Sequence, residues 1–319
     1  MFENIYGNRK TVENLKNSIE SDRVSHCYLF SGEKGLGKRT IAKAFAKALL
    51  CEGEEGMRPC NKCRACVKVD KEEHHDLIFV GHEKPNTFGV EDIRDGLNRD
   101  IVIRPNEAKR KIYIIDDAEL LNVQAQNAML KTIEEPPEYA VIMLLSDNKE
   151  SFLPTVLSRC VEFNMMSVKD RELIAALKER NLYEEVMESY ITEFAGGNIG
   201  RAIRLLTDEV YREKVTNVDK VLQELPRMGI NDIREALPLL GGREDMDMVL
   251  SRMQVYFGNL LKLKATDSQT ARGDIARQYS YEDFPRIFGE IEHFRVRMKV
   301  NVNADLSLEL LLDAMRPKA

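Results

Sequence analysis

The chain has 319 residues, enough for two or three domains that each bury a core of their own. It is 43% hydrophobic and 31% charged and holds only 18 Gly and 10 Pro, which excludes a disordered or collagen-like chain. The 47 basic and 53 acidic residues give a net charge of −6, which argues against a protein that coats nucleic acid through bulk positive charge. The longest apolar run, residues 140–145, is far shorter than the roughly 20 residues of a membrane helix, and Met1-Phe2-Glu3-Asn4 opens no signal peptide. We therefore expect a cytoplasmic protein with no membrane partner.

Residues 1–163 alternate strand-like and helix-like segments, the pattern of an α/β domain with a largely parallel sheet. Residues 38–50 are rich in Ala and Lys and predict a helix, as do residues 122–134, where Pro136-Pro137 ends the helical pattern. Short apolar runs predict strands at residues 27–30, 77–80, 112–115, 141–145 and 161–163.

Beyond this domain the strand signals stop, and the sequence predicts amphipathic helices interrupted at glycines. We predict a small helical unit at residues 164–208, where Gly196-Gly197-Asn198 separates two helices, and a larger helical domain at residues 209–319. The last predicted helix, residues 306–315, has one apolar face, which is either a seam of the domain core or a surface that a partner subunit buries. That face consists of Leu308, Leu311, Leu312 and Met315.

A Gly-rich segment follows the first predicted strand and opens the first predicted helix. Residues 31–40 read Ser-Gly-Glu-Lys-Gly-Leu-Gly-Lys-Arg-Thr, and this G-x-x-x-x-G-K pattern between a strand and a helix is typical of a phosphate-binding P-loop. The glycines let backbone N–H groups converge on phosphate oxygens, while the lysine and the helix N-terminus supply positive charge. The alternative is a Gly-rich turn without a ligand. The residues predicted to bind nucleotide in this loop are Gly32, Gly35, Gly37, Lys38 and Thr40.

The residue after the loop lysine departs from the P-loop pattern. A Ser or Thr there binds Mg²⁺, whereas Arg39 has only donors and would repel a cation. Thr40 lies about 100° further round the helix and is expected to point away from that site. Asp116-Asp117, at the end of the third predicted strand, resembles a Walker B motif, in which Asp116 would hold Mg²⁺ and Asp117 replaces the usual glutamate. Either nucleotide binds without productive hydrolysis or the loop is a relic, and the two acids are otherwise solvated residues at a strand end.

Four of the six cysteines fall within 16 consecutive positions and supply the four thiolates of a closed tetrahedral zinc site. A ferredoxin-type run would need a further Cys followed by Pro, so structural Zn²⁺ is favoured over an iron–sulfur cluster or metal-free thiols. His74 and His75 nearby are interpreted as surface residues, and the remaining cysteines, Cys27 and Cys160, stand alone in the sequence. The predicted metal ligands are Cys51, Cys60, Cys63 and Cys66.

Several motifs make the chain resemble the clamp-loader subunits of the AAA+ superfamily. Residues 131–137 (Lys-Thr-Ile-Glu-Glu-Pro-Pro) and Ser158-Arg159-Cys160 are specific to clamp loaders, whereas the phosphate loop alone fits many NTPases. The full set spans nearly the whole chain and consists of residues 25–32, 51–66, 127–137, 158–160 and 301–309. The resemblance implies an AAA+ P-loop α/β domain with a parallel sheet at residues 1–163 that includes a zinc module at about 51–66, a helical lid at 164–208, and a helical collar for oligomerisation at 209–319.

The resemblance also implies roles for single residues. In that family the arginine of the Ser-Arg-Cys motif reaches into the nucleotide site of the neighbouring subunit, and Arg159 matches it. The alternative for Arg159 is a structural arginine paired with a local acid such as Glu162. Arg201 matches the sensor arginine of the lid helix, although an exposed helix arginine is the plainer interpretation. Asn148, at the polar end of the fourth strand, is chosen as the first sensor position.

The function implied by the resemblance is that of a stator subunit in the DNA polymerase III clamp loader, with weak or absent ATPase activity of its own. Its partners would be the gamma/tau and delta subunits in a heteromeric ring, and through them the sliding clamp and primed DNA. The nearest alternative is the ATPase motor subunit of the same loader, against which Arg39 argues. A stand-alone NTP-driven switch or a DNA-binding zinc protein is the alternative from another class. No aromatic residue lies between the basic residues beside the cysteines, which gives base stacking little support.

Overall fold

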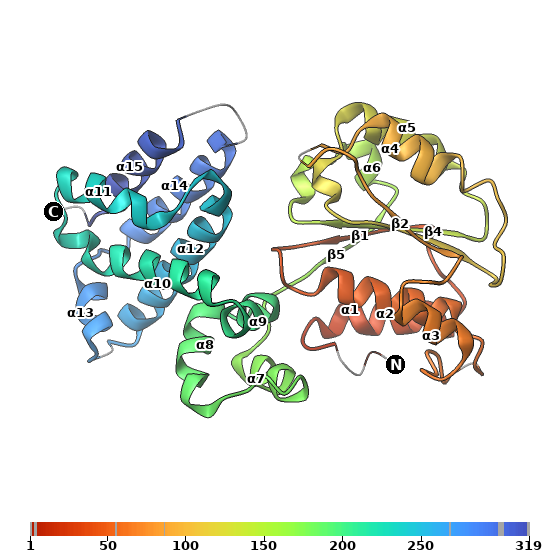
Figure 1. The fold of residues 1–319 in the computed structure, drawn as a ribbon, viewed down its shortest axis with the longest axis horizontal. Coiled ribbons are helices and arrows are strands. Elements are labelled where there is room, and N and C mark those ends of the chain that lie inside the picture. Colours follow the sequence, from red (N-terminus) through yellow and green to blue (C-terminus); the bar gives the residue numbers. More distant parts are fainter. Residues whose placement is uncertain are drawn as a thin grey trace. The chain divides into compact units, whose positions relative to one another are not determined.

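The computed structural model describes residue 2 and residues 5–54, 56–85, 87–267, 269–298 and 303–317. The chain consists of two compact units (Figure 1). The first unit consists of Met1–Ala176 with Asn198–Gly200, and the second of Leu177–Gly197 with Arg201–Ala319. The three-domain division predicted from the sequence stays a prediction, and Asn301 and Val302 of the similar C-terminal stretch lie outside the described residues. No helix in the described part of the chain is long and apolar enough to span a bilayer.

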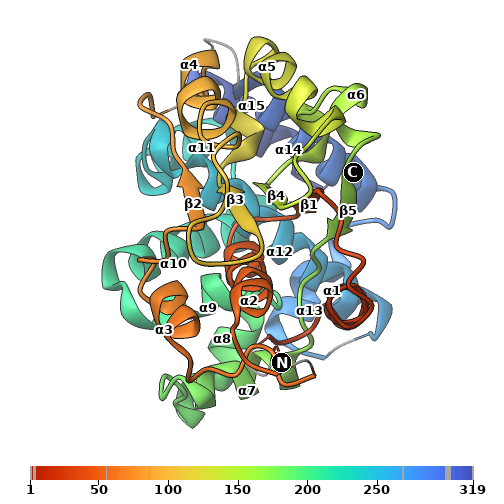
Figure 2. The ribbon, with the colours of Figure 1, turned by 90° about the vertical axis from the view of Figure 1, so that its right-hand side faces the viewer.

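A five-stranded parallel sheet with the strand order β2-β3-β4-β1-β5 is the centre of the first unit, with β2 and β5 at its edges (Figure 2). The strands are β1 (Cys27–Ser31), β2 (Leu77–Val80), β3 (Lys111–Ile115), β4 (Ala140–Ser146) and β5 (Val161–Asn164). All five predicted strands are present, with ends that differ by at most one residue. Every residue of the three inner strands is buried, as expected for parallel strands covered on both faces, which explains their continuous apolar runs.

Helices cover both faces of this sheet (Figure 1). On one face lie α1 (Arg9–Glu20), α2 (Lys38–Leu50) and α3 (Arg64–Asp70); on the other lie α4 (Val90–Ile93), α5 (Val123–Glu134) and α6 (Pro154–Leu157). Residues of β1 alternate between the two faces, so that Cys27 and Leu29 join the core beneath α5, whereas Tyr28 and Phe30 join the core beneath α2. The helix α5 begins after Asn122, whose side chain accepts a hydrogen bond from the Ala125 N–H at 2.8 Å and caps the helix.

The second unit is built from helices and contains no strand among its described residues. Its helices are α8 (Glu188–Ala195), α9 (Ile199–Thr207), α10 (Glu209–Glu224), α11 (Ile230–Ala236), α12 (Met246–Ala265), α13 (Ala271–Arg277), α14 (Asp283–Met298) and α15 (Ala304–Ala314). The helix α7 (Asp170–Glu179) crosses the boundary between the units. Leu308, Leu311, Leu312 and Met315 are all buried in the core of this unit. The apolar face of the last helix is therefore a core seam, one of the two alternatives left open by the sequence.

Candidate functional site

The predicted phosphate loop joins β1 to α2. Gly35 and Gly37 have φ angles of 91° and 88°, in the left-handed region that strains other residues. Gly37 is also the N-cap of α2, so the loop turns directly into the helix that begins with Lys38. Gly32 lies at the start of the same loop, and Thr40 is exposed on α2. The residues predicted to bind phosphate thus lie on one strand–loop–helix turn.

The loop lysine is bonded to the chain itself. Lys38 is only 8% exposed, and its Nζ donates to the carbonyl oxygens of Gly32 at 2.6 Å and Glu33 at 3.2 Å. It also pairs with Asp147 Oδ1 at 2.5 Å, directly after β4. A phosphate group bound in this loop would have to compete with the Asp147 carboxylate for the lysine.

The next residue, Arg39, pairs with Asp116, the acid predicted to hold Mg²⁺. Its Nη1 lies 3.1 Å from Asp116 Oδ2, its Nη2 lies 3.2 Å from Glu72 Oε2, and its guanidinium stacks 4.6 Å above the ring of Phe79. Partial burial alone would lower the pKa of Arg39, but hydrogen bonds and charges from Asp116 and Glu72 outweigh burial and raise it. A cationic guanidinium therefore binds the carboxylate that was predicted to hold Mg²⁺.

A short segment, Asn198–Gly200, packs onto this loop, and the sequence alone did not indicate the contact. The buried Asn198 donates from Nδ2 to the Lys34 carbonyl at 2.8 Å, and the Gly200 N–H donates to the Gly35 carbonyl at 3.0 Å. A Cβ on Gly35 would lie 2.4 Å from Asn198 Oδ1, so the close approach requires glycine there. This segment fixes the loop in its present shape.

The two predicted sensor residues make local contacts. Asn148 Oδ1 accepts a hydrogen bond from the Glu150 N–H at 2.9 Å, which caps the short helical segment Lys149–Ser151. Its neighbour Asp147 is the residue that reaches the loop lysine. Arg201 Nη1 donates to the carbonyl of Ala195, the last residue of α8, at 3.0 Å. The polar end of β4 was predicted to contribute to the site through Asn148. The contact with the loop is made by Asp147 instead.

The cysteine cluster has the donor set of a metal site. The Sγ atoms of Cys51, Cys60, Cys63 and Cys66 all lie within 4.8 Å of one another. Four tetrahedral sulfurs at the usual Zn–S distance would lie about 3.8 Å apart, so a small contraction suffices. Backbone N–H groups donate to three of the sulfurs at 3.3–3.4 Å, as around metal-bound thiolates. Backbone N–H groups of Lys62 and Cys63 lower the pKa of Cys60 to about 6, whereas burial raises the pKa of Cys51 and Cys66. The four residues fit a zinc ion.

Arg159 lies on the turn between α6 and β5. Its Nη1 donates to the Thr155 carbonyl at 2.9 Å and to Ser158 Oγ at 3.2 Å, and its Nη2 lies 2.8 Å from Glu134 Oε1 on α5. The local acid is thus Glu134. Glu162, the partner considered from the sequence, lies 3.8 Å from Lys149 instead. The guanidinium is folded back on its own chain and stays 36% exposed.

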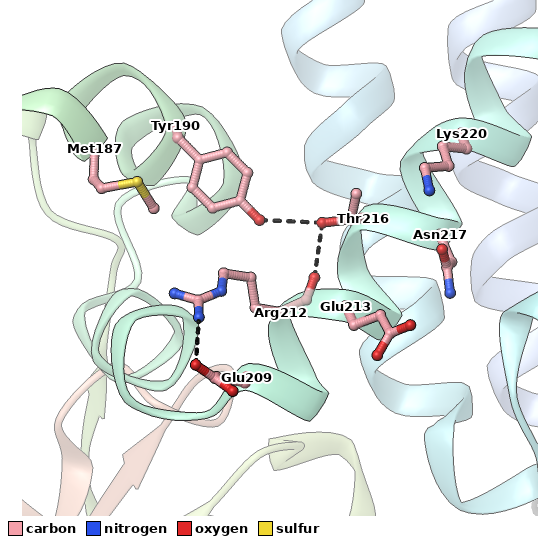
Figure 3. A pocket seen from close by; sticks show the side chains of 8 residues that line it. All are labelled: Met187, Tyr190, Glu209, Arg212, Glu213, Thr216, Asn217 and Lys220. Atoms are coloured by element: carbon pink, nitrogen blue, oxygen red, sulfur yellow. Dashed lines mark hydrogen bonds and ion pairs between the residues drawn. The ribbon is translucent and has the colours of Figure 1, made fainter.

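A separate pocket of about 480 Å³ lies in the second unit between α8 and α10 (Figure 3). The hydroxyls of Tyr190 and Thr216 meet across it at 3.3 Å, and Arg212 lies 3.7 Å from Glu209. Its lining mixes both charge signs, and none of the predicted site residues belongs to it.

The parallel sheet and the glycine-rich turn into α2 define a P-loop protein of the α/β class. A family model described as "DNA polymerase III, delta subunit" matches residues 7–169. The gamma subunit of Buchnera aphidicola (subspecies Baizongia pistaciae) is 31% identical over 82% of this chain and 72% of its own length. The chain therefore belongs to the clamp-loader family of DNA polymerase III subunits, and the resemblance seen in the sequence is confirmed.

Other relatives carry different subunit names. The tau subunit of Bacillus subtilis is 30% identical over 82% of this chain and 50% of its own length. The delta-prime subunit of Bacillus subtilis is 29% identical over 68% of this chain and 64% of its own length. The chain thus spans half the length of the tau relative, and sequence identity of this size does not distinguish the subunit types.

Proposed function

We propose that this chain is a stator subunit of the delta-prime type in a DNA polymerase III clamp loader. It completes the ATP site of a neighbouring subunit with Arg159 and does not hydrolyse ATP in its own loop. Its partners are gamma/tau and delta subunits in a ring that opens a sliding clamp and places it on primed DNA in the cytoplasm. The observation that carries the proposal is the ion pair between Arg39 and Asp116.

This ion pair opposes hydrolysis in the chain's own loop. Phosphoryl transfer from ATP needs Mg²⁺ to bridge the β- and γ-phosphates, and the metal is held by a hydroxyl after the loop lysine and by the Walker B acid. Arg39 offers no acceptor and places its charge on Asp116 Oδ2 at 3.1 Å. Lys38 and the loop amides still allow ATP to bind without turnover.

The position of Arg159 supports action in trans. The phosphate loop follows the C-terminal end of β1, whereas Arg159 precedes β5, which runs parallel to β1 with Tyr28 opposite Val161. The five-residue strand β1, which spans roughly 15 Å, therefore separates the two sites. Arg159 therefore lies at the N-terminal end of the strands, opposite to the end that carries its own loop, and is suited to a phosphate held by another subunit. Its planar guanidinium would exchange the Glu134 carboxylate for phosphate oxygens of similar geometry.

The ATPase motor subunit of the same loader is the second candidate, because relatives named gamma and tau are 30–31% identical to this chain. Arg39 separates the two functions. A motor needs a Mg²⁺-binding hydroxyl at this position. The guanidinium found here instead forms an ion pair with Asp116, the proposed Walker B acid.

Steady-state ATP turnover by the isolated chain with Mg²⁺ tests this choice. We expect negligible turnover by the natural chain and a gain in Arg39→Thr, which restores a hydroxyl and frees Asp116. Arg39→Lys is the matched control, because it keeps the charge without supplying a hydroxyl. Turnover by the natural chain on the order of 1 s⁻¹ or more would favour the motor subunit.

The cysteine module is proposed to hold one structural zinc ion. Four thiolates fill a tetrahedral site and leave no position for water or substrate, so the metal has no part in catalysis. Cys51 directly follows α2, the helix that begins at the phosphate loop, and Cys66 lies within α3. Zinc would therefore fasten the far end of the loop helix to α3.

A further inference from the structure

The two cysteines outside the zinc cluster, isolated in the sequence, meet in the folded chain. In the register of β1 and β5, Tyr28 lies opposite Val161, so that Cys27 and Cys160 stand opposite each other one residue earlier. Their Sγ atoms are 3.0 Å apart. Cys27 is fully buried beneath α5, whereas Cys160 is partly exposed at the end of the Arg159 turn.

This geometry fits a disulfide. A disulfide needs an S–S distance of about 2.05 Å and Cα atoms about 4.4–6.8 Å apart. Neighbouring strands lie about 4.7–4.9 Å apart, which places opposed residues inside that range. The two sulfurs therefore need to approach by only about 1 Å, and no rearrangement of the strands is required.

We propose that Cys27 and Cys160 are a thiol modification site that hydrogen peroxide converts into a disulfide, which fastens the Arg159 turn to β1. The turn is closed by two backbone hydrogen bonds, from the Arg159 N–H to the Val156 carbonyl and from the Cys160 N–H to the Leu157 carbonyl, each 3.1 Å. A covalent bond at Cys160 adds a fixed point next to Arg159. The effect of this fixed point on the ATP site of a neighbouring subunit rests on the proposed function of Arg159. The disulfide itself depends on this chain alone.

The reaction proceeds in two balanced steps. The accessible Cys160 thiolate attacks one oxygen of the peroxide, the O–O bond breaks, and a sulfenic acid and hydroxide form. The sulfur of Cys27 then attacks the sulfenic sulfur, the S–O bond breaks, and the departing hydroxide takes the Cys27 proton as water. Two thiols lose two electrons in total, and one peroxide becomes two waters. The contact with Cys160 and burial both raise the pKa of Cys27, which keeps that thiol protonated and leaves the first attack on peroxide to Cys160.

Peptide mapping of the full chain tests the modification. The purified protein is treated with limiting hydrogen peroxide, its free thiols are blocked with N-ethylmaleimide, and a proteolytic digest is analysed by mass spectrometry. We expect one cross-linked peptide pair that contains Cys27 and Cys160, lighter by two hydrogens than the separate peptides and reversed by dithiothreitol. Hydrogen exchange of the amides at residues 154–160 should slow in the oxidised protein.

Two variants control the experiment. Cys160→Ser and Cys27→Ala should each lose both the cross-link and the slowed exchange. Oxidation of Cys160 alone to sulfinic acid, or alkylation of both thiols after peroxide treatment, overturns the proposal. If a variant does not fold, the peptide map of the natural chain decides alone. Because these measurements use the isolated chain, their failure and the failure of Arg159 to act in trans are distinguishable.

Discussion

The basic side chains near the two ends of β1 differ in how many acids they pair with. At its C-terminal end, Lys38 pairs with Asp147, and Arg39 pairs with Asp116 and Glu72. These acids come from the ends of β4 and β3 and from just beyond α3, so that three separate parts of the chain converge on the loop. The positive charge that would bind and activate a nucleotide is matched inside the chain.

At the N-terminal end of the sheet, Arg159 has fewer acidic partners. Within the described part of the chain it pairs with one acid, Glu134, whereas Arg39 pairs with two. Its other contacts are to its own turn. The basic side chains of the chain's own loop are thus paired with three acids. Arg159 needs to give up only one acidic partner, Glu134, to bind a phosphate.

Loss of the proposed zinc ion is expected to have the largest effect, which falls on the 51–66 module. Structural zinc contributes about 10–16 kcal/mol to folding in small zinc-finger peptides. We expect Cys63→Ser to lose zinc and to open the 51–66 module to protease, whereas the control Cys160→Ser, outside the cluster, keeps one zinc per chain. Native mass spectrometry gives the metal content. A folded, metal-free natural chain with four freely reactive thiols would contradict the zinc site.

The next largest effect is expected at Asp76, directly before β2. Its buried carboxylate accepts N–H groups of three consecutive residues at 2.6, 2.8 and 2.8 Å. Burial alone would raise the pKa of Asp76, but the three backbone hydrogen bonds outweigh burial, so the pKa is lowered overall. Because hydrogen bonds to a charged group are worth about 1.5–3 kcal/mol, we expect Asp76→Asn to lower the free energy of unfolding by that amount at neutral pH.

The contribution of Asp76 to the free energy of unfolding depends on pH. A carboxyl with a lowered folded-state pKa stabilises the fold above its unfolded pKa, and the contribution is lost as the pH falls through the folded value. The difference between Asp76→Asn and the natural chain in urea unfolding should therefore shrink below about pH 4. Asp70→Asn, at the exposed partner of the Lys47 ion pair, is the control with a smaller expected effect. A difference that stays constant down to pH 3 would contradict the assignment.

The smallest effect on stability is expected at the partner of Arg159. Glu134→Gln removes the one acid paired with Arg159, and since both side chains are partly exposed, the free energy of unfolding should fall by only about 0–1 kcal/mol. In an assembled loader this variant should keep ATP turnover, because Glu134 competes with phosphate for the guanidinium. Glu135→Gln serves as the neighbouring control. Loss of turnover in Glu134→Gln alone would show that Glu134 positions Arg159 instead of competing for it.

Local patterns predicted much of this fold. Continuous apolar runs marked β1 to β4, and the three inner strands are buried along their whole length, as parallel strands covered on both faces are. The edge strand β5, Val-Glu-Phe-Asn, buries only Phe163. Helix α2 was predicted with both ends correct, since Gly37 and Lys38 belong to a signature of strand, loop and helix. The four clustered cysteines indicated a donor set through their spacing alone. Each of these signals lies within about twenty consecutive residues.

The missed features depend on contacts between distant residues. The partner of Arg159 is Glu134 because α5 lies beside the turn, and the pairing of Cys27 with Cys160 requires the strand order. Asn198 reaches the phosphate loop from 164 residues away in the sequence. The prediction that His74 lies at the surface was wrong: it is buried, and its Nδ1 accepts the Asp76 N–H at 3.1 Å. Sequence pattern does not specify which of two adjacent polar residues faces inward.

Replacement of Arg159 in an assembled loader tests the central claim most directly. The complex is assembled with Arg159→Ala, normal incorporation is confirmed by native mass spectrometry, and DNA- and clamp-stimulated ATP turnover is compared with that of the natural and Arg159→Lys chains. Loss of an arginine finger costs about 10³ to 10⁵ in rate at the dependent site, and the whole complex should lose less because other sites keep their own arginines. We predict normal assembly with this loss at the adjacent site, and a weaker defect in Arg159→Lys. Normal assembly with unchanged turnover at that site would contradict the account.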